Sequence, residues 1–231
     1  MATALAGPTL GIPDTVSFVH LSGALGLEAL QALRVRHAVG SFHPLQSFPG
    51  TRPPAAFEGI TVATDASAPA LLRRLSRLAR DLGAHPVRVV DRDRVLYHAA
   101  AVFASNYVDV VVHEAVVLLQ ASGWSEREAT RGLLPLVDGS IENIRRRGTV
   151  AALTGPIRRG DADTVRRHLD ALHKLARGSS ARPEAAVEAV YRMLGSIALD
   201  VAKRAGLDPA AARRIQRALT GKAAATRRRS R

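Results

Sequence analysis

The sequence predicts an α/β domain joined to an all-α domain. Short apolar segments typical of strands alternate with helical segments up to about residue 90, and helical patterns alone follow from Arg94 onward. The chain has 231 residues, and 47% of them are hydrophobic, which suffices for one substantial core or two modest ones. We therefore expect an α/β domain over residues 1–93, a helical domain over 94–220 and a basic, disordered tail over 221–231.

The α/β domain begins with alternating strands and helices. Its first helix follows a turn over residues 22–24, and its second strand ends at His43 and Pro44. A Pro- and Gly-rich loop over 49–54 separates the second strand from the third. The expected elements are a buried strand over 15–21, a helix over 25–33, and strands over 35–42, 60–63 and 86–90.

The clearest helix of this domain lies before its last strand. Ser67 is the expected N-cap, Pro69 suits the first turn, and Gly83 ends the helix. Its apolar face repeats at helical spacing and consists of Leu71, Leu72, Leu75, Leu78, Ala79 and Leu82.

The second domain is expected to be entirely helical. Strand patterns stop before it, and glycine-containing loops separate its segments. The expected helices cover residues 94–121, 125–147, 161–177, 183–205 and 208–220.

Composition excludes several kinds of site. The chain has no cysteine, so disulfides and thiolate metal sites are ruled out. No export signal is recognisable, and Asn106, Asp109, His113 and Glu114 interrupt the longest apolar run. We therefore expect a cytoplasmic protein without a membrane span.

The net charge of +13 is concentrated towards the C-terminal end. Eight basic residues and no acidic residue lie between Arg213 and Arg231. A segment rich in Arg and Ala has little to bury, so we interpret it as a solvated tail, with weak contact to RNA or other polyanions as the alternative. Aromatic residues make up 4% of the chain, which leaves few platforms for base stacking and disfavours a dedicated nucleic-acid-binding function.

Polar residues form a stripe on an otherwise apolar helix. His98, Ser105, Asn106, Asp109 and His113 fall within about 100° of one helical wheel. Such a stripe is either the satisfied interior of an interface or the wall of a site. In a site, His98 would transfer a proton near neutral pH, while Ser105 and Asn106 would hydrogen-bond a substrate. Asp109 and His113 have the spacing of metal ligands, but no third ligand is in view and we predict no metal.

A loop between two predicted helices has the composition of an anion site. Thr154 and the backbone of Gly155 can approach a ligand closely, and Arg158 and Arg159 can pair with an anion. Asp161 can also cap the following helix, which leaves an ordinary capped loop as the alternative.

Two strand ends form a third candidate. If the strands are parallel, their carboxyl ends lie at one edge of the sheet, and Ser22, Gly23 and His43 border a crevice there. The Ser-Gly-Ala pattern by itself is common and does not identify a ligand.

Five separated motifs agree with one protein family in sequence and in order. They are VHLSGALGLEAL, GSFHPLQSF, LYHAAAVFASNY, GLLPLVDGSIENI and ALTGPIRRGDADTVRRHLDAL. Over roughly residues 15–199 the chain resembles Rossmann-like proteins with a DUF2520 C-terminal domain, a family of NADP-dependent oxidoreductases distantly similar to pyrroline-5-carboxylate reductase. The resemblance implies the C-terminal remnant of a Rossmann-like sheet followed by a helical domain similar to the C-terminal domain of 6-phosphogluconate dehydrogenase.

The resemblance also implies a ligand set and a partner. NADP, or NAD, is the expected cofactor, a small molecule is the substrate, the active site lies between the two domains, and the helical domain forms a homodimer. The residues that match the family motifs fall into three groups: for catalysis His98, Ser105 and Asn106; for cofactor binding Ser22, Gly23, His43 and Pro44; and for substrate binding Asn143, Thr154, Gly155, Arg159 and Asp161.

One part of the family pattern is missing. Family members begin with a strand and a G-x-G-x-x-G turn that holds the pyrophosphate of the cofactor. No such motif occurs in this sequence. We therefore expect a protein truncated at its N-terminus, inactive or impaired in this form and with feeble affinity for NADPH. The alternative is a protein that has lost dinucleotide binding.

Two functions from different classes follow. The first is an NAD(P)-dependent oxidoreductase that acts on a small carbonyl, imine or hydroxy substrate. The second is a non-catalytic helical dimerisation or interaction module, in which the polar stripe is buried between subunits. The sequence leaves the substrate and the direction of reaction open.

Overall fold

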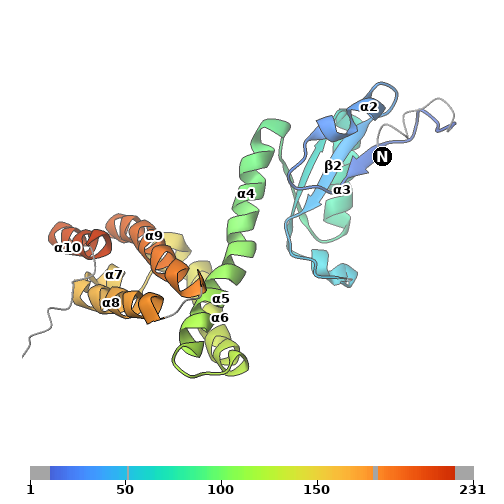
Figure 1. Cartoon of the computed structure of the whole chain (residues 1–231). Coiled ribbons are helices and arrows are strands. Elements are labelled where there is room, and N and C mark those ends of the chain that lie inside the picture. Colours follow the sequence, from blue (N-terminus) through green and yellow to red (C-terminus); the bar gives the residue numbers. More distant parts are fainter. Residues whose placement is uncertain (1–10, 51, 179–181, 222–231) are drawn as a thin grey trace, which may run out of the picture. The chain divides into compact units, whose positions relative to one another are not determined.

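The computed structural model describes residues 11–50, 52–178 and 182–221. The chain divides into two compact units, and the boundary in the sequence falls between Asp109 and Val110. The helix that begins at Arg94 is therefore grouped with the sheet. Figure 1 labels helices and strands of both units. Except for Gly221, the basic tail expected over 221–231 lies outside the described residues.

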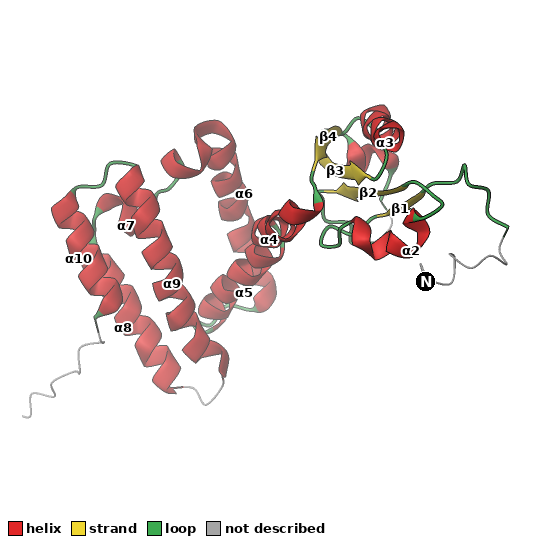
Figure 2. Ribbon diagram, turned by 90° about the horizontal axis from the view of Figure 1, so that it is seen from above, coloured by secondary structure: helices red, strands yellow, loops and turns green. Residues whose placement is uncertain are grey.

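The first unit is built on a mixed sheet, for which the described residues supply four strands in the order β1-β2-β3-β4. β1 runs parallel to β2, β2 runs antiparallel to β3, and β3 runs parallel to β4. The prediction of an α/β region followed by helices is confirmed. The strands are β1 (Phe18–His20), β2 (Val39–Pro44), β3 (Thr61–Ala66) and β4 (His85–Arg88) (Figure 2).

One face of the sheet is covered by α3 (Pro69–Asp81), which forms where the leucine pattern predicts it. The buried side chains of Leu71 and Leu75 belong to one apolar cluster with Phe42 and Val62 of the sheet. Burial of four such side chains stabilises the unit by about 1.5–3 kcal/mol each, before the entropy of ordering them is subtracted.

The predicted cap of this helix is wrong. Ala68 occupies the N-cap position and makes no side-chain capping bond. The hydroxyl of Ser67 instead accepts a hydrogen bond from the backbone N–H of Val39 at 3.0 Å, and the N–H of Ser67 donates to the carbonyl of Val39 at 2.8 Å. Ser67 therefore extends the pairing of β2 and β3, and this cross-strand bonding takes the hydroxyl away from the helix.

The opposite face of the sheet carries two short helices instead of the single helix expected over 25–33 (Figure 2). They are η2 (Leu27–Leu30) and α2 (Gln31–Arg34). Leu27 and Leu33 are buried with Val39 of β2 in a small apolar cluster. The carboxyl end of β2 lies outside this cluster and is available for contacts with other residues.

β1 is shorter and more exposed than predicted. A buried strand was expected over 15–21, but β1 spans three residues. Val19 is 38% exposed, and Leu21, just beyond the strand, is 65% exposed. The reason is that β1 has one neighbour, β2, among the described strands.

The prediction of one continuous helix over 94–121 is also wrong. α4 (Arg94–Ala104) ends at Ser105, which has φ −125° and ψ −80°, and α5 (Asn106–Gln120) follows. Ser and Asn favour helix ends because their side chains compete for backbone hydrogen bonds. The break removes the single helical wheel on which the polar stripe was drawn.

The segment Asp91–Gln120, which contains both helices, is the one part of the described chain with the length and apolar composition of a membrane span. A stretch of 18 residues within it has a mean hydropathy of 1.5, and only 6% of that stretch is buried. The expectation that the polar residues of this run exclude a membrane span therefore stays a prediction. This match rests on length and composition alone, so it does not explain why the apolar side chains of the segment are exposed.

The second unit consists of helices in its described residues. Its core lies where the last four of them meet, around the fully buried Val165, Leu199, Ala202 and Ile215. The helices after α5 are α6 (Glu126–Ala151), α7 (Gly155–Arg159), α8 (Ala162–Gly178), α9 (Arg182–Arg204) and α10 (Pro209–Thr220).

Two features distinguish this unit from the prediction. Gly148 lies inside α6 with φ +74°, so the helix turns sharply at the residue where it was expected to end. α7 then forms one short helix within the loop expected over 148–160.

Candidate functional site

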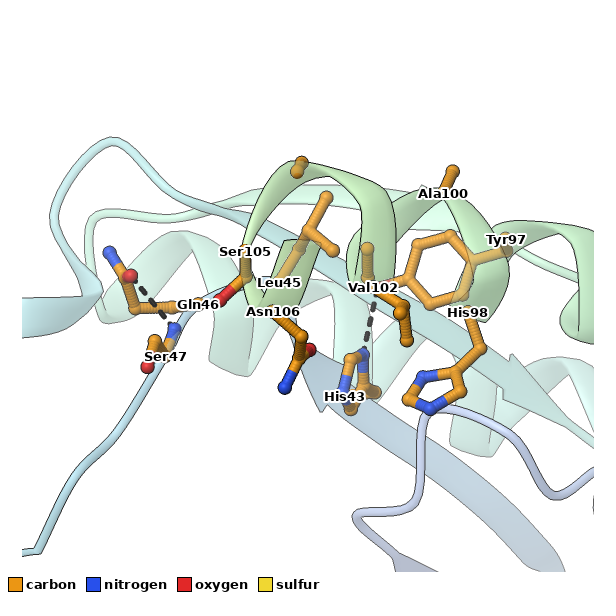
Figure 3. A pocket seen from close by; sticks show the side chains of 12 residues that line it. His43, Leu45, Gln46, Ser47, Tyr97, His98, Ala100, Val102, Ser105 and Asn106 are labelled. Atoms are coloured by element: carbon orange, nitrogen blue, oxygen red, sulfur yellow. Dashed lines mark hydrogen bonds between the residues drawn. The ribbon is translucent and has the colours of Figure 1, made fainter. Parts of the chain in front are cut away.

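A cavity of about 580 Å³ lies in the first unit, beside the end of β2 and one face of α4 (Figure 3). β2 and the loop after it contribute His43, Leu45, Gln46 and Ser47. α4 and the residues after it contribute Tyr97, His98, Ala100, Ala101, Val102, Ala104, Ser105 and Asn106. The alanine side chains are short, so the longer polar side chains are the main groups on the cavity wall.

His43 and Tyr97 form the central contact of the cavity. His43 Nδ1 lies 2.8 Å from the Tyr97 hydroxyl oxygen, and the two rings meet edge to face at 5.6 Å and 88° (Figure 3). The direction of this hydrogen bond depends on which tautomer His43 adopts. If Nδ1 accepts from the hydroxyl, Nε2 carries the proton and is a donor; in the other tautomer, Nε2 is an acceptor.

His98 lies next to this pair. Its ring centre is 6.4 Å from that of His43, and its Nδ1 atom is buried with no partner in the described residues. A buried polar atom without a partner is uncommon in native proteins and calls for a ligand, a water molecule or a functional reason. The cavity therefore has two neighbouring imidazoles, one of which is unsatisfied.

The protonation states of these groups follow from burial. Desolvation is the main cause that lowers the pKa of His43, and the charges of His98 and Arg94 lower it further. Desolvation also raises the pKa of Tyr97, with a smaller opposing effect of Arg94. Both groups are therefore neutral near neutral pH, which suits a site that hands over or receives a proton.

The loop after β1 packs directly on His43. A Cβ atom added to Gly23 would lie 2.7 Å from two atoms of the His43 ring, so this close approach requires glycine. The sequence placed Ser22, Gly23 and His43 at one edge of the sheet on the condition that the strands are parallel. β1 and β2 are parallel, so the three residues do lie at the same edge. Pro44 and His43 also line an adjoining cavity of about 420 Å³.

The same loop does not fit the pyrophosphate of a dinucleotide. The backbone N–H groups of residues 25–27 already donate, in order, to side-chain oxygens of Ser22, Glu28 and Asp91 at 3.1, 2.9 and 3.0 Å. Two of these acceptors are carboxylates, which repel a phosphate. A phosphate cradle needs free backbone N–H groups at a glycine-rich turn. The N–H groups of residues 25–27 are not free. We assign no phosphate-binding role to it.

All three residues predicted to be catalytic line the cavity, and the other two residues of the stripe do not. His98, Ser105 and Asn106 all line it. Asp109 and His113 are exposed, follow the break at Ser105 and do not line it. No group of three metal-ligating side chains occurs among the described residues.

Tyr97 and Arg94 are functional candidates that the sequence did not single out. Tyr97 binds His43, and Arg94 is buried beneath the same strand ends. A helical pattern can indicate the face on which Tyr97 lies, but the partner on β2 becomes visible only in the fold.

The residues predicted to bind substrate belong to the second unit. Thr154 lines a separate cavity of about 320 Å³, with His168 and Tyr191 among its other wall residues. Gly155 has φ +88°, and Arg159 is exposed. Asn143 is half-buried on α6.

Asp161 has a clear local role. Its carboxylate accepts hydrogen bonds from the backbone N–H of Thr164 at 3.0 Å and from the Thr164 hydroxyl at 2.7 Å. These two bonds lower the pKa of Asp161. The residue therefore caps the start of α8, which was the alternative to a binding role.

Comparisons with known proteins agree on the fold. The model of the family described as "Domain of unknown function (DUF2520)" matches residues 60–198. Among solved structures, a Bacteroides fragilis protein provisionally named an NADP oxidoreductase matches with a TM-score of 0.68 and 23% identity, over 88% of this chain and 71% of its own. A Thermotoga maritima protein matches with a TM-score of 0.69 and 22% identity, over 88% and 74% of the two chains.

A pyrroline carboxylate reductase from Plasmodium falciparum, solved with NADP bound, matches with a TM-score of 0.44 and 8% identity, over 87% of this chain and 71% of its own. A likeness this low supports no inference about the present chain. No curated protein gives a match.

Proposed function

Since the chain belongs to the DUF2520 family, we propose that it forms part of an NADP-dependent oxidoreductase, and that a small substrate binds in the cavity beside His43 and His98. One observation carries the proposal: the imidazoles of His43 and His98 and the hydroxyl of Tyr97 line a cavity large enough for a small molecule. The fold shared with a protein provisionally named an NADP oxidoreductase supports the reaction class.

When bound, the nicotinamide cofactor would supply a hydride in its reduced form, NADPH, or accept one in its oxidised form, NADP+. The described residues would orient the substrate and transfer the proton. Reduction of a carbonyl or imine requires a proton at the oxygen or nitrogen that gains negative charge. His98 is the proposed donor, because its ring borders the cavity and one of its nitrogen atoms is unpartnered. In the oxidative direction the same imidazole accepts the proton.

The neighbouring polar side chains orient the substrate. Ser105 and Asn106 lie on the cavity wall and offer a hydroxyl and an amide to a polar substrate group. We further propose that the loop with Thr154, Gly155 and Arg159 in the second unit binds an anionic substrate group, and that Asn143 assists it. Asp161 contributes by holding the helix that follows this loop.

Cofactor binding by this chain is proposed to be feeble. Ser22, Gly23, His43 and Pro44 are proposed to contact the nicotinamide end of NADP or NAD. The pyrophosphate would lack a cradle in the described residues, because the N–H groups at the β1 loop are already bonded. We therefore expect the chain to be impaired as an enzyme in this form.

The exposed apolar surface favours a homodimer. Val95, Leu96 and Phe103 of α4 are 72%, 77% and 67% exposed, which is unusual for large apolar side chains on one helix. In the second unit, Met193 and Ile197 of α9 are exposed as well, at 68% and 54%. The same surface supports the second candidate function, a non-catalytic cytoplasmic dimerisation or interaction module.

NADPH consumption separates the two functions. The full chain would be assayed at saturating NADPH with a panel of small aldehydes, keto acids and cyclic imines, followed by NADPH absorbance. Oxidoreductase function predicts turnover that falls by about 10²-fold in H98A. The matched control is H85Q, a change at an exposed histidine of β4, which should leave turnover unchanged. Because feeble cofactor binding by itself lowers turnover, the NADPH concentration is one that titration shows to saturate the chain. No turnover under that condition, together with a stable dimer in H98A, would favour the interaction module.

NADPH titration calorimetry and sedimentation test the remaining parts. A submicromolar dissociation constant for NADPH would contradict the proposed lack of a phosphate cradle. For the dimer, L96D on α4 should shift the sedimenting species to a monomer. The control is V35D, since Val35 is 87% exposed in the same unit but outside α4.

A further inference from the structure

Arg94 is a buried cation at the point where β1, β2 and α4 meet. Its side chain is 1% exposed. One terminal nitrogen, Nη1, donates to the carbonyl oxygen of Ser22 at 3.2 Å, and the other, Nη2, donates to the hydroxyl of Ser41. Ser22 follows β1 and Ser41 lies within β2. One side chain therefore ties both parallel strand ends to the first turn of α4.

Arg94 forms no ion pair with a carboxylate in the described residues. Its Nε atom has no hydrogen-bond partner there. Burying a cation without a carboxylate is costly, and a well-packed neutral side chain is often at least as stabilising at such a position. Stability alone does not account for an arginine here.

The position of Arg94 links it to the cavity. Tyr97 and His98 follow it by three and four residues, so the three side chains lie on neighbouring positions of one helix face. Anchoring of the first turn by Arg94 fixes the place of Tyr97, whose hydroxyl lies 2.8 Å from His43 Nδ1. Arg94 itself does not line the cavity, so it acts through these residues.

Few charged or titratable groups surround His43. α4 contributes Tyr97, His98 and Arg94. The loop after β2 contributes Arg52, which lines the adjoining cavity together with His43. The loop over residues 21–24 has no titratable side chain, and no acidic side chain lines either cavity. The strands on either side of β2 carry His20 and Asp65 at the register position of Ser41, and the carboxylate of Asp65 pairs with Arg88. The pKa of His43 is lowered by burial and by the charges of His98 and Arg94.

We propose that Arg94 is a positioning residue: it holds Tyr97 and His98 against His43 and supplies the buried positive charge that His43 faces. The use of this arrangement for proton transfer rests on the proposed function. The geometry and the charge themselves are properties of this chain and can be measured without cofactor or substrate.

The test is an NMR titration of the histidine rings in the full chain. In wild type, His43 loses its proton below the pH typical of histidine, because burial, His98 and Arg94 all lower its pKa. R94Q removes the charge, so the midpoint of His43 should move to higher pH. R74Q is the matched control, since Arg74 is exposed on α3 and forms none of the ion pairs of the described residues; it should leave the midpoint in place.

A second pair of variants separates position from charge. R94K keeps a positive charge but loses the planar fork that spans Ser22 and Ser41. S41A removes one of the two contacts and leaves the charge untouched. In both variants the nuclear Overhauser contact between the rings of Tyr97 and His43 should weaken, while the midpoint of His43 stays low.

Two results would overturn the inference. One is an unchanged midpoint in folded R94Q, and the other is a full-strength contact between Tyr97 and His43 in both R94K and S41A. If R94Q does not fold, the contact in R94K and S41A decides alone. A failed search for NADPH turnover would leave these results standing, so failure of the proposed function is distinguishable from failure of this inference.

Discussion

His43 and Tyr97 are 54 positions apart in the chain, yet the Nδ1 atom of one lies 2.8 Å from the hydroxyl oxygen of the other. His43 is near the end of β2, and Tyr97 is in the first part of α4. The contact exists only when the helix packs on the strand end. Its integrity therefore reports whether the candidate site has formed.

Replacing Tyr97 by phenylalanine should loosen this contact. Y97F removes the hydroxyl and leaves His43 Nδ1 without its partner, at an expected cost of about 0.5–1.5 kcal/mol in the free energy of unfolding. Urea unfolding followed by circular dichroism measures the change. Y107F is the control, because Tyr107 is 48% exposed and its edge-to-face contact with Phe103 does not use the hydroxyl. Equal stability of Y97F and wild type would contradict the assigned role.

Gly23 should tolerate no side chain. In G23A the new methyl group would meet the His43 ring at 2.7 Å, so the ring or the loop must move. We expect a loss of about 1–3 kcal/mol and a shift of the His43 ring resonances. G139A is the matched control, since a Cβ at Gly139 meets no atom within 4 Å and alanine favours a helix. A G23A variant with unshifted His43 resonances would exclude the close packing.

The stability of the chain should fall in mild acid. Burial is the largest cause that lowers the pKa of both His20 and His43, so the unfolded chain binds these protons more readily than the folded chain. Their contribution to stability is fully present above the ordinary histidine pKa of 6.5 and is lost as the pH falls through the lowered values. Urea midpoints measured from about pH 7.5 to about pH 5 should therefore decrease.

Variants assign this pH dependence to its source. H43Q should flatten part of it, because glutamine has no proton to bind in this range. H85Q, at an exposed histidine of β4, should not. A slope that is identical in H43Q and wild type would show that His43 does not contribute.

Two substitutions at Asp161 separate its capping role from substrate binding. Asparagine can still accept the bond from the Thr164 N–H, whereas alanine cannot. If capping is the only role, D161N keeps the thermal midpoint of the chain and D161A lowers it. A D161N protein that unfolds normally but loses NADPH-dependent turnover would instead indicate a charge used on the substrate.

Much of the fold follows from local patterns in the sequence. The leucines of α3 repeat at helical spacing, and each of the predicted strands appears within a few residues of its expected position. Glycines mark the helix ends correctly: Gly83 and Gly206 adopt positive φ just after helices. These signals depend on residues that are close together in the sequence, so contacts between distant segments change them little.

What failed depends on contacts between distant segments. Ser67 carries a cap pattern, but pairing with Val39 takes its hydroxyl. The break at Ser105 interrupts a run whose pattern is helical on both sides of it, and a helical wheel cannot register a change of direction. Of the site, the sequence located His98, Ser105 and Asn106 on one wall of the cavity. It missed Tyr97 and Arg94, because only their contacts with residues in or next to the strands indicate a role for them, and these contacts form between distant parts of the sequence.

The open side of β1 has a practical consequence for work with this protein. A strand that has a single neighbour among the described strands, that contains the exposed Val19 and that is followed by the exposed Leu21, is a template for adding further backbone. Concentrated stocks should gain intermolecular sheet on storage, visible as rising thioflavin fluorescence. A lysine in place of Val19 would be a simple way to keep samples monodisperse for the NMR titrations.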